Sequence, residues 1–287
     1  MQIKNAIALG TFDGVHKGHR AVLNLPEGYN KIAVSFSVPP KSVLSDESEL
    51  ITTTEDKCRI LKNINIDEIY LLDFENIRDM RASEFLEFLY KKFAPCLISC
   101  GFNYRFGKNG EGNTETLQKF CEEKGIEFKC VSPVNTGDIP VSSTLIRKML
   151  ASGEIDKANS LLTESFSFES EVISGDRRGR TIGFPTVNQR YPKELVRLKF
   201  GVYRTAVLIG EKRYSGITNI GIRPTYKSDY IISETYILNF SGNLYGKKIR
   251  IVPLEFLREE KKFSSLEELK KQIAEDIKNT DNLYQGD

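Results

Sequence analysis

The chain of 287 residues contains no tryptophan and only two histidines. No apolar stretch approaches the roughly 20 residues of a membrane-spanning helix, so we expect no membrane partner. The five cysteines form an odd set without a CxxC pair, which disfavours a zinc site or redox dithiol and favours reduced packing residues. The N-terminus lacks the basic head and long apolar core of a secretory signal, and we therefore expect a cytoplasmic protein.

A strong charge of either sign is also missing. The formal net charge is +2, and no clustered basic and aromatic face is visible, so we expect no nucleic-acid partner. Hydrophobic residues make up 40% of the chain and charged residues 28%, which supplies enough apolar material for large cores. The length predicts two domains.

In the first half, apolar runs of strand length alternate with segments of helical period. The expected strands are 6–9, 31–36, 68–72, 96–100 and 126–131, and the expected helices are 55–64, 81–93 and 114–124. Within 81–93, Phe85, Leu89 and Phe93 recur every four residues on one apolar face. This alternation predicts an α/β domain, a parallel sheet flanked by helices.

The pattern changes near residues 160–166. Two more helices are expected at 143–151 and 154–163, and the sequence then becomes rich in strands and turns, which predicts an antiparallel barrel or sandwich. A final amphipathic helix, 265–278, begins with Ser265 and Glu268 in the spacing of a capping box. We expect one domain over residues 1–163 and a second over 164–287.

Both histidines, His16 and His19, lie in the run GTFDGVHKGH, whose interleaved glycines are Gly10, Gly14 and Gly18. The glycines allow a sharp turn after a buried strand, with a helix beginning near Gly18. Such turns in open α/β sheets bind phosphate, because free amide groups and a positive helix terminus attract anions. Two imidazoles there can stabilise the charge that builds during attack on a nucleotide's α-phosphate. A zinc or structural pair is the alternative, although no cysteine or third histidine lies close in sequence.

A second segment, GDRRGRTIGFPTVN, runs from Gly175 to Asn188 and is rich in glycine and arginine. Backbone amides of such a flap can approach a nucleotide's phosphates, and the hydroxyl of Thr186 and the amide of Asn188 can hold Mg²⁺. Neither the Walker spacing nor the protein kinase signatures are present. A solvated basic loop is the alternative interpretation.

These motifs resemble those of a known family. GTFDGVHKGH is similar to the HxGH nucleotidyltransferases, and its FDGVH form resembles the FMN adenylyltransferase half of bacterial bifunctional riboflavin kinase/FAD synthetases. GFNYRFGKNG (101–110) resembles the family's flavin segment, and VSSTLIRKML (141–150) resembles its SSTxxR signature. Pro185 to Asn188, PTVN, resembles the PTAN motif of riboflavin kinases. GVY, NIGIRPT, NFSGNLYGK and FLREEKKF follow in the expected order, at 201–203, 219–225, 239–247 and 256–263.

The resemblance implies a Rossmann-like HxGH nucleotidyltransferase domain followed by an antiparallel β-barrel flavokinase domain with a terminal helix. It implies that the C-terminal domain phosphorylates riboflavin to FMN with ATP. The N-terminal domain would adenylylate FMN to FAD with release of pyrophosphate. Both steps would require Mg²⁺, and ATP, riboflavin and FMN would be the small-molecule substrates.

The resemblance also implies site residues, with His16, His19 and Glu234 catalytic. In the N-terminal domain it assigns ATP or FMN binding to Gly10, Phe12, Asp13, Gly14, Gly18, Asn103, Ser142, Ser143, Thr144 and Arg147. In the C-terminal domain it assigns ATP or flavin binding to Gly175, Arg180, Thr181, Gly183, Pro185, Thr186, Asn188 and Arg223, with Thr186 and Asn188 also holding Mg²⁺. Without the family, Ser142 to Thr144 are interpreted equally well as the N-cap of the following helix, and the two roles are compatible.

One segment departs from the family. FSVPPKSVL has Val38 and Pro39 where the FxPHPxxV pattern has Pro and His. The departure motivates an alternative, a single-activity riboflavin kinase with an impaired adenylyltransferase domain. A non-catalytic flavin-sensing or RNA-binding regulator is an alternative from another class. A generic cytidylyltransferase would match HxGH alone and would leave the C-terminal half unexplained.

Overall fold

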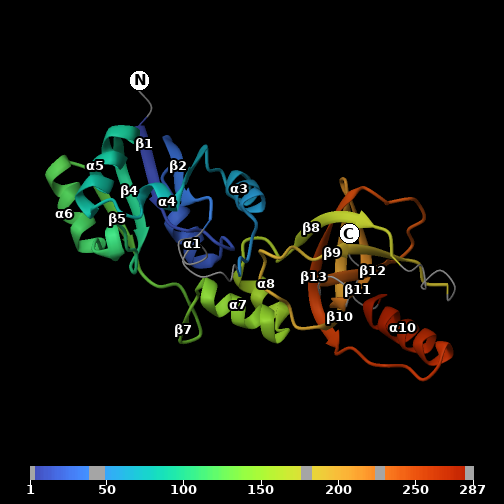
Figure 1. The fold of residues 1–287 in the computed structure, drawn as a ribbon. Helices are drawn as coiled ribbons and strands as arrows, with labels where there is room; N and C mark the ends of the chain where they lie inside the picture. The colour runs from blue at the N-terminus through green and yellow to red at the C-terminus, as the bar shows by residue number, and fades with distance from the viewer. Residues whose placement is uncertain (1–3, 39–48, 176–182, 224–229, 282–287) are drawn as a thin grey trace. The chain divides into compact units, whose positions relative to one another are not determined.

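The computed structural model of the chain describes residues 4–38, 49–175, 183–223 and 230–281 (Figure 1). Its contacts divide the chain into two compact units, Met1–Ile146 with Leu161–Glu164, and Arg147–Ser160 with Ser165–Asp287. The division falls within two helices, α7 (Ser143–Ser152) and α8 (Ile155–Leu161). Within the described ranges, no helix has the length and apolar character needed to cross a membrane.

The first unit is built on a five-stranded parallel sheet with the order β3-β2-β1-β4-β5. Its strands are β1 (Lys4–Leu9), β2 (Tyr29–Phe36), β3 (Glu68–Leu72), β4 (Pro95–Gly101) and β5 (Glu127–Val131). All five predicted strands are confirmed. The strand order reverses at β1, whose neighbours are β2 and β4, so the loop after β1 lies at the position where open α/β sheets bind ligands.

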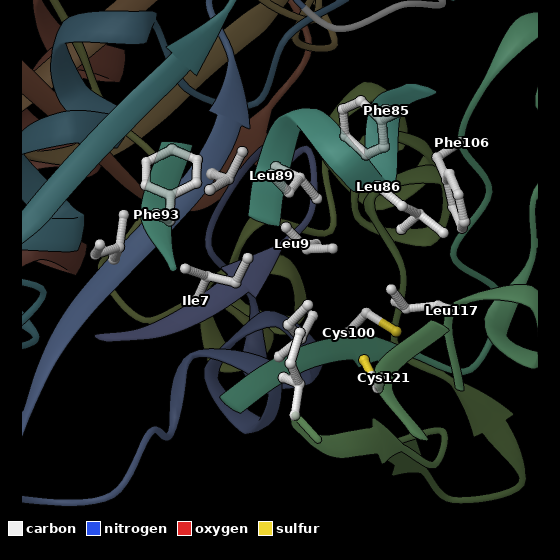
Figure 2. Close-up of a cluster of buried hydrophobic side chains, with 14 of the residues drawn as sticks. Ile7, Leu9, Phe85, Leu86, Leu89, Phe93, Cys100, Phe106, Leu117 and Cys121 are labelled. Carbon is white, nitrogen blue, oxygen red and sulfur yellow. The ribbon is translucent and has the colours of Figure 1, made fainter. Parts of the chain in front are cut away.

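Helices pack against both faces of this sheet. They are α1 (Lys17–Leu23), α3 (Thr54–Asn63), α4 (Phe74–Ile77), α5 (Ala82–Phe93) and α6 (Thr114–Lys124), and a short hairpin follows with β6 (Asn135–Thr136) and β7 (Ile139–Pro140). Ile7 and Leu9 of β1 pack with apolar side chains of α5 and α6 (Figure 2). Ala6 and Ala8, which face the other way, pack with α1 and α3. Burial on both faces explains why the strands appear in the sequence as continuous apolar runs.

The second unit is a closed antiparallel barrel with the strand order β10-β11-β12-β9-β8-β13. Its strands are β8 (Phe168–Ile173), β9 (Thr186–Arg190), β10 (Gly201–Ile209), β11 (Lys212–Arg223), β12 (Tyr230–Ile237) and β13 (Lys248–Arg258). Thr205, Thr218 and Thr235 are fully buried and form a chain of hydroxyl hydrogen bonds of 3.0 and 2.9 Å. These hydrogen bonds satisfy the three hydroxyl groups inside the barrel. Because inward and outward residues alternate along each strand, the neighbours of these threonines face outward.

The terminal helix α10 (Leu266–Asp281) packs on the outer face of the barrel, where Ile277 meets Val202 and Ile217. The predicted helix is confirmed, but its cap differs from the expected capping box. Ser265 Oγ accepts the amide of Glu268 as predicted, whereas the Glu268 carboxylate binds the backbone and hydroxyl of Ser264. Ser264 offers two donors to one carboxylate, and these hydrogen bonds lower the pKa of Glu268 to about 2.

Candidate functional site

The loop that leaves β1 has an unusual backbone. Phe12, Gly14 and Val15 have φ values of +50°, +81° and +38°. A β-branched residue such as Val15 is strained in this region, and strain of this kind clusters at ligand sites. A side chain at Gly14 would be strained, because its φ is positive and a Cβ there would lie 2.9 Å from the side chain of Ile51.

Asp13 anchors this loop to the segment before α3. The residue is 3% exposed, and its Oδ1 accepts the backbone amides of Ile51 at 2.9 Å and Thr52 at 3.2 Å. The amide of Gly14 in turn donates to Thr52 Oγ1 at 3.1 Å. These contacts give Asp13 a role in holding the loop, and its contact with ATP or FMN stays a prediction.

The two histidines lie against each other at the end of the loop. His16 is the N-cap of α1, and its Nδ1 accepts the backbone amide of His19 at 3.3 Å. The two rings stack with their centroids 3.6 Å apart. A Cβ on Gly18 would lie 3.1 Å from Cε1 of His16, so glycine leaves the room that the stacked ring needs. Because Nδ1 is the acceptor, a neutral His16 carries its proton on Nε2.

His19 is half-buried, and the ring of Phe12 meets it edge-on at a centroid distance of 5.4 Å. Its Nδ1 is buried and has no hydrogen-bond partner among the described residues. Burial lowers the pKa of His19 well below its usual range, and the positive charges of His16 and Lys57 lower it further. His19 is therefore neutral at pH 7, so it can form a hydrogen bond with a ligand without carrying a charge.

Sequence reasoning missed Lys57 of α3. Its side chain is buried, and Nζ donates to the carbonyl of Phe36 at the end of β2 and, at 3.5 Å, to that of Thr11 in the loop after β1. Burial lowers the pKa of Lys57. A signal was present in the sequence, because Lys57 precedes Ile60 and Leu61 by three and four residues on the apolar face of the predicted helix 55–64.

The SST segment reaches the same loop through one hydroxyl. Ser142 Oγ accepts the amide of Leu145 at 3.3 Å, as expected of an N-cap. Ser143 Oγ donates to the carbonyl of Asp13 at 3.0 Å. This hydrogen bond connects the start of α7 to the loop between β1 and α1, which we call the histidine loop. Thr144 is exposed. Arg147 lies four residues after Ser143 and on the same side of α7, in the stretch that belongs to the second unit.

Two further predicted segments follow the ends of β4 and β2, the two strands that flank β1. Asn103 is exposed and follows β4, and a Cβ on Gly101 would lie 3.6 Å from its Oδ1. Since parallel strands end at one edge of a sheet, Asn103 and the histidine loop share that edge. Val38 follows β2 and is 41% exposed, whereas Pro39 lies outside the described residues.

In the barrel, Glu234 lies at the centre of a polar row across three strands. It is directly opposite Asn188 of β9 on one side and Asn219 of β11 on the other. Directly opposite residues share a face of a sheet. Because Thr235, the next residue along β12, points into the barrel, this row lies on the outer face.

Asn188 is 6% exposed, and its Oδ1 has no hydrogen-bond partner within the part of the chain that the structure describes. A Cβ on Gly175 would lie 2.4 Å from its Nδ2, so any larger residue there would displace the Asn188 amide. Thr186 lies two residues before Asn188 on the same face, opposite Tyr236. The structure thus brings Thr186, Asn188 and Glu234, three residues that the resemblance assigns to the kinase site, onto one face of two neighbouring strands.

The remaining predicted kinase residues are only partly described. Gly183 has a φ of +86°, and Phe184, which precedes Pro185, meets Tyr236 edge-on at 5.4 Å. Arg223 ends β11, and its side chain is not described. Arg180 and Thr181 lie outside the described residues. Among the described residues, no three His, Cys, Asp or Glu side chains gather as a metal site.

Comparisons with known proteins match both halves of the chain. A family model described as FAD synthetase matches residues 1–145, and one described as riboflavin kinase matches residues 162–284. The bifunctional riboflavin kinase/FMN adenylyltransferase of Listeria monocytogenes is 32% identical over 289 residues, covering 97% of this chain and 92% of that protein. The Escherichia coli K12 protein of the same name is 34% identical over 281 residues, covering 94% of this chain and 90% of that protein.

A solved structure is similar over almost the whole chain. It is a crystal structure named as a macrolide-efflux protein from Streptococcus pneumoniae. It superposes with a TM-score of 0.90 at 28% sequence identity, covering 98% of this chain and 95% of that one.

Proposed function

The chain belongs to the bifunctional riboflavin kinase/FMN adenylyltransferase family, and from this premise we propose how its own residues carry out the two reactions. It is a transferase that phosphorylates riboflavin to FMN and adenylylates FMN to FAD. The single-activity kinase and the non-catalytic regulator are not favoured, because family models for both activities match and the curated relatives are named for both. We do not propose efflux, since neither family model describes it.

We place the boundary between the two activities at residues 163 and 164. The matched ranges, 1–145 and 162–284, support this division. We also propose that the protein works in the cytoplasm, without a nucleic-acid partner. All five cysteines are free thiols, which suits a reducing compartment.

The stacked histidines carry the proposal for adenylyl transfer. His16 uses Nδ1 to cap α1, so a neutral ring carries its proton on Nε2, the atom that would donate to a phosphoryl oxygen. His19 is neutral, so it can form a hydrogen bond with a phosphoryl oxygen without first losing an ion-pair partner. Together they stabilise the charge that develops at the α-phosphate while an FMN phosphate oxygen attacks it and pyrophosphate leaves. Lys57 and Ser143 act as positioning residues, because both hold the loop through backbone carbonyls.

In the barrel, Glu234 accepts the proton of the riboflavin 5′-hydroxyl as the oxygen attacks the γ-phosphate of ATP and ADP leaves. Mg²⁺ fits beside it, because the unpartnered Oδ1 of Asn188 and the hydroxyl of Thr186 are oxygen donors on one strand face. When bound, the metal supplies positive charge to the β- and γ-phosphates. Asn188 and Thr186 would hold it, while Glu234 handles the proton.

Separate assays of the two steps test this division. His16→Ala should abolish FAD formation from supplied FMN and leave FMN formation from riboflavin intact, and Glu234→Gln should do the reverse. Lys17→Ala is the matched control for the first variant, since Lys17 is exposed and adjacent in α1. Loss of both activities in either variant would contradict the two-site model.

A further inference from the structure

Asn219 and Glu260 form a pair beside Glu234 that neither reaction described above uses. Asn219 Nδ2 donates to Glu260 Oε1 at 3.0 Å. A carboxylate can only accept, so this hydrogen bond determines which end of the amide faces Glu260. Oδ1 of Asn219 must then point away from Glu260. That atom is buried and has no hydrogen-bond partner among the described residues.

The surroundings of the pair are shaped for this arrangement. A Cβ on Gly221 would lie 2.4 Å from Glu260 Oε1, so glycine lets the carboxylate lie against the backbone of β11. On the other side, Asn219 is opposite Val202 of β10, which is 6% exposed and offers no polar group from its side chain. The amide is therefore held by one carboxylate, and its buried acceptor has no partner among the described residues.

The two sides of Glu234 differ in what they present. Asn188 and Thr186, the proposed metal ligands, lie on β9, and Asn219 lies on β11, two strand spacings away from β9, or roughly 10 Å. The metal that Asn188 and Thr186 would hold would neutralise the β- and γ-phosphates of ATP, so we expect these phosphates near those two residues. The phosphates therefore belong to the β9 side of Glu234, which leaves the β11 side for the flavin.

We propose that Asn219, oriented by Glu260, accepts a hydrogen bond from a second hydroxyl of the riboflavin side chain. Riboflavin carries a polyol chain, so a hydroxyl donor is available next to the one that Glu234 deprotonates. The contact selects the hydroxyl that reaches Glu234 and contributes to riboflavin binding. The inference rests on the proposed kinase function and adds a flavin-binding and positioning residue to it.

Steady-state kinetics of FMN formation by the full chain test the proposal. For Asn219→Ala, we expect the KM for riboflavin to rise about tenfold, equivalent to ~1.4 kcal/mol, as one hydrogen bond is lost. The KM for ATP should change less than about twofold, because the phosphates lie on the other side of Glu234. An unchanged KM for riboflavin, or an equal rise in both KM values, would overturn the proposal.

Glu260→Gln is a second variant, which changes only one atom type at an exposed carboxylate. A glutamine both donates and accepts, so the Asn219 amide is free to turn, and the KM for riboflavin should rise about threefold. Glu259→Gln is the control, since Glu259 pairs with Lys199 instead. If Asn219→Ala does not fold, the difference between Glu260→Gln and Glu259→Gln decides. If the unmodified chain makes no FMN, the proposed function itself fails; if it makes FMN and both variants match it, only this inference fails.

Discussion

The imidazole rings of His16 and His19 stack at a centroid distance of 3.6 Å with an interplanar angle of 17°. Two positive charges at this separation would repel each other strongly in a partly buried site. The depressed pKa of His19 agrees with this, since the charge of His16 is one of its causes. The pair therefore works with at least one neutral ring, and it contributes hydrogen bonds to phosphate more than net charge.

Stability should depend on pH through His19. Its pKa in the folded chain lies below the ordinary value of about 6.5, so the unfolded chain binds the proton more readily. The stability that neutral His19 contributes is fully present above about pH 6.5 and is lost as the pH falls below this value. Urea denaturation at pH 7.5 and 5.5 should show a larger loss of unfolding free energy for the unmodified chain than for His19→Asn. Equal losses would show that another group is responsible.

Gly18→Ala should impair FAD formation. The new Cβ would lie 3.1 Å from Cε1 and 3.2 Å from Nδ1 of His16, so the ring must shift. Small displacements of catalytic groups cost about 10- to 100-fold in rate. We expect a loss of this size in FAD formation from FMN, measured by chromatography, with riboflavin phosphorylation unchanged. Lys17→Ala at the preceding exposed position should have little effect.

Lys57→Met should weaken both the N-terminal unit and its reaction. The carbonyls of Phe36 and Thr11 lose their common donor, at a cost of about 1–3 kcal/mol in unfolding free energy. The pKa of His19 should rise as the neighbouring charge disappears, which NMR titration of the imidazole can follow. Lys62→Met, at an exposed position of the same helix, is the control. A variant with normal FAD formation and an unchanged His19 pKa would contradict the role given to Lys57.

Thr218→Val should destabilise the barrel. Thr218 is the middle member of the buried hydroxyl chain, so its loss removes both hydrogen bonds, to Thr205 and to Thr235. We expect a decrease of about 1–3 kcal/mol in unfolding free energy by urea denaturation. Thr205→Val leaves the bond between Thr218 and Thr235 intact and should cost less. Equal costs would mean that the hydroxyls do not act as a chain.

Local pattern was sufficient to predict much of this protein. Apolar runs located all five strands of the parallel sheet, and the spacing of Phe85, Leu89 and Phe93 predicted α5 to within one residue at its start. These features are readable because side-chain period depends only on neighbouring residues. The same holds for the loop with His16 and His19, whose glycines and histidines lie within ten residues of each other.

Tertiary structure decided the rest. Strand pairing, which joins residues far apart in sequence, closed the second unit into a barrel rather than a sandwich and placed Asn188 and Asn219 on either side of Glu234. The packing of α3 against the sheet buried Lys57 beside the ends of β1 and β2. The local pattern could indicate the apolar face of the helix, but not the carbonyls that accept hydrogen bonds from Lys57. The sequence alone determined which residues could do the chemistry. Which residues they contact depends on strand register and on packing, and no local sequence pattern encodes either of these.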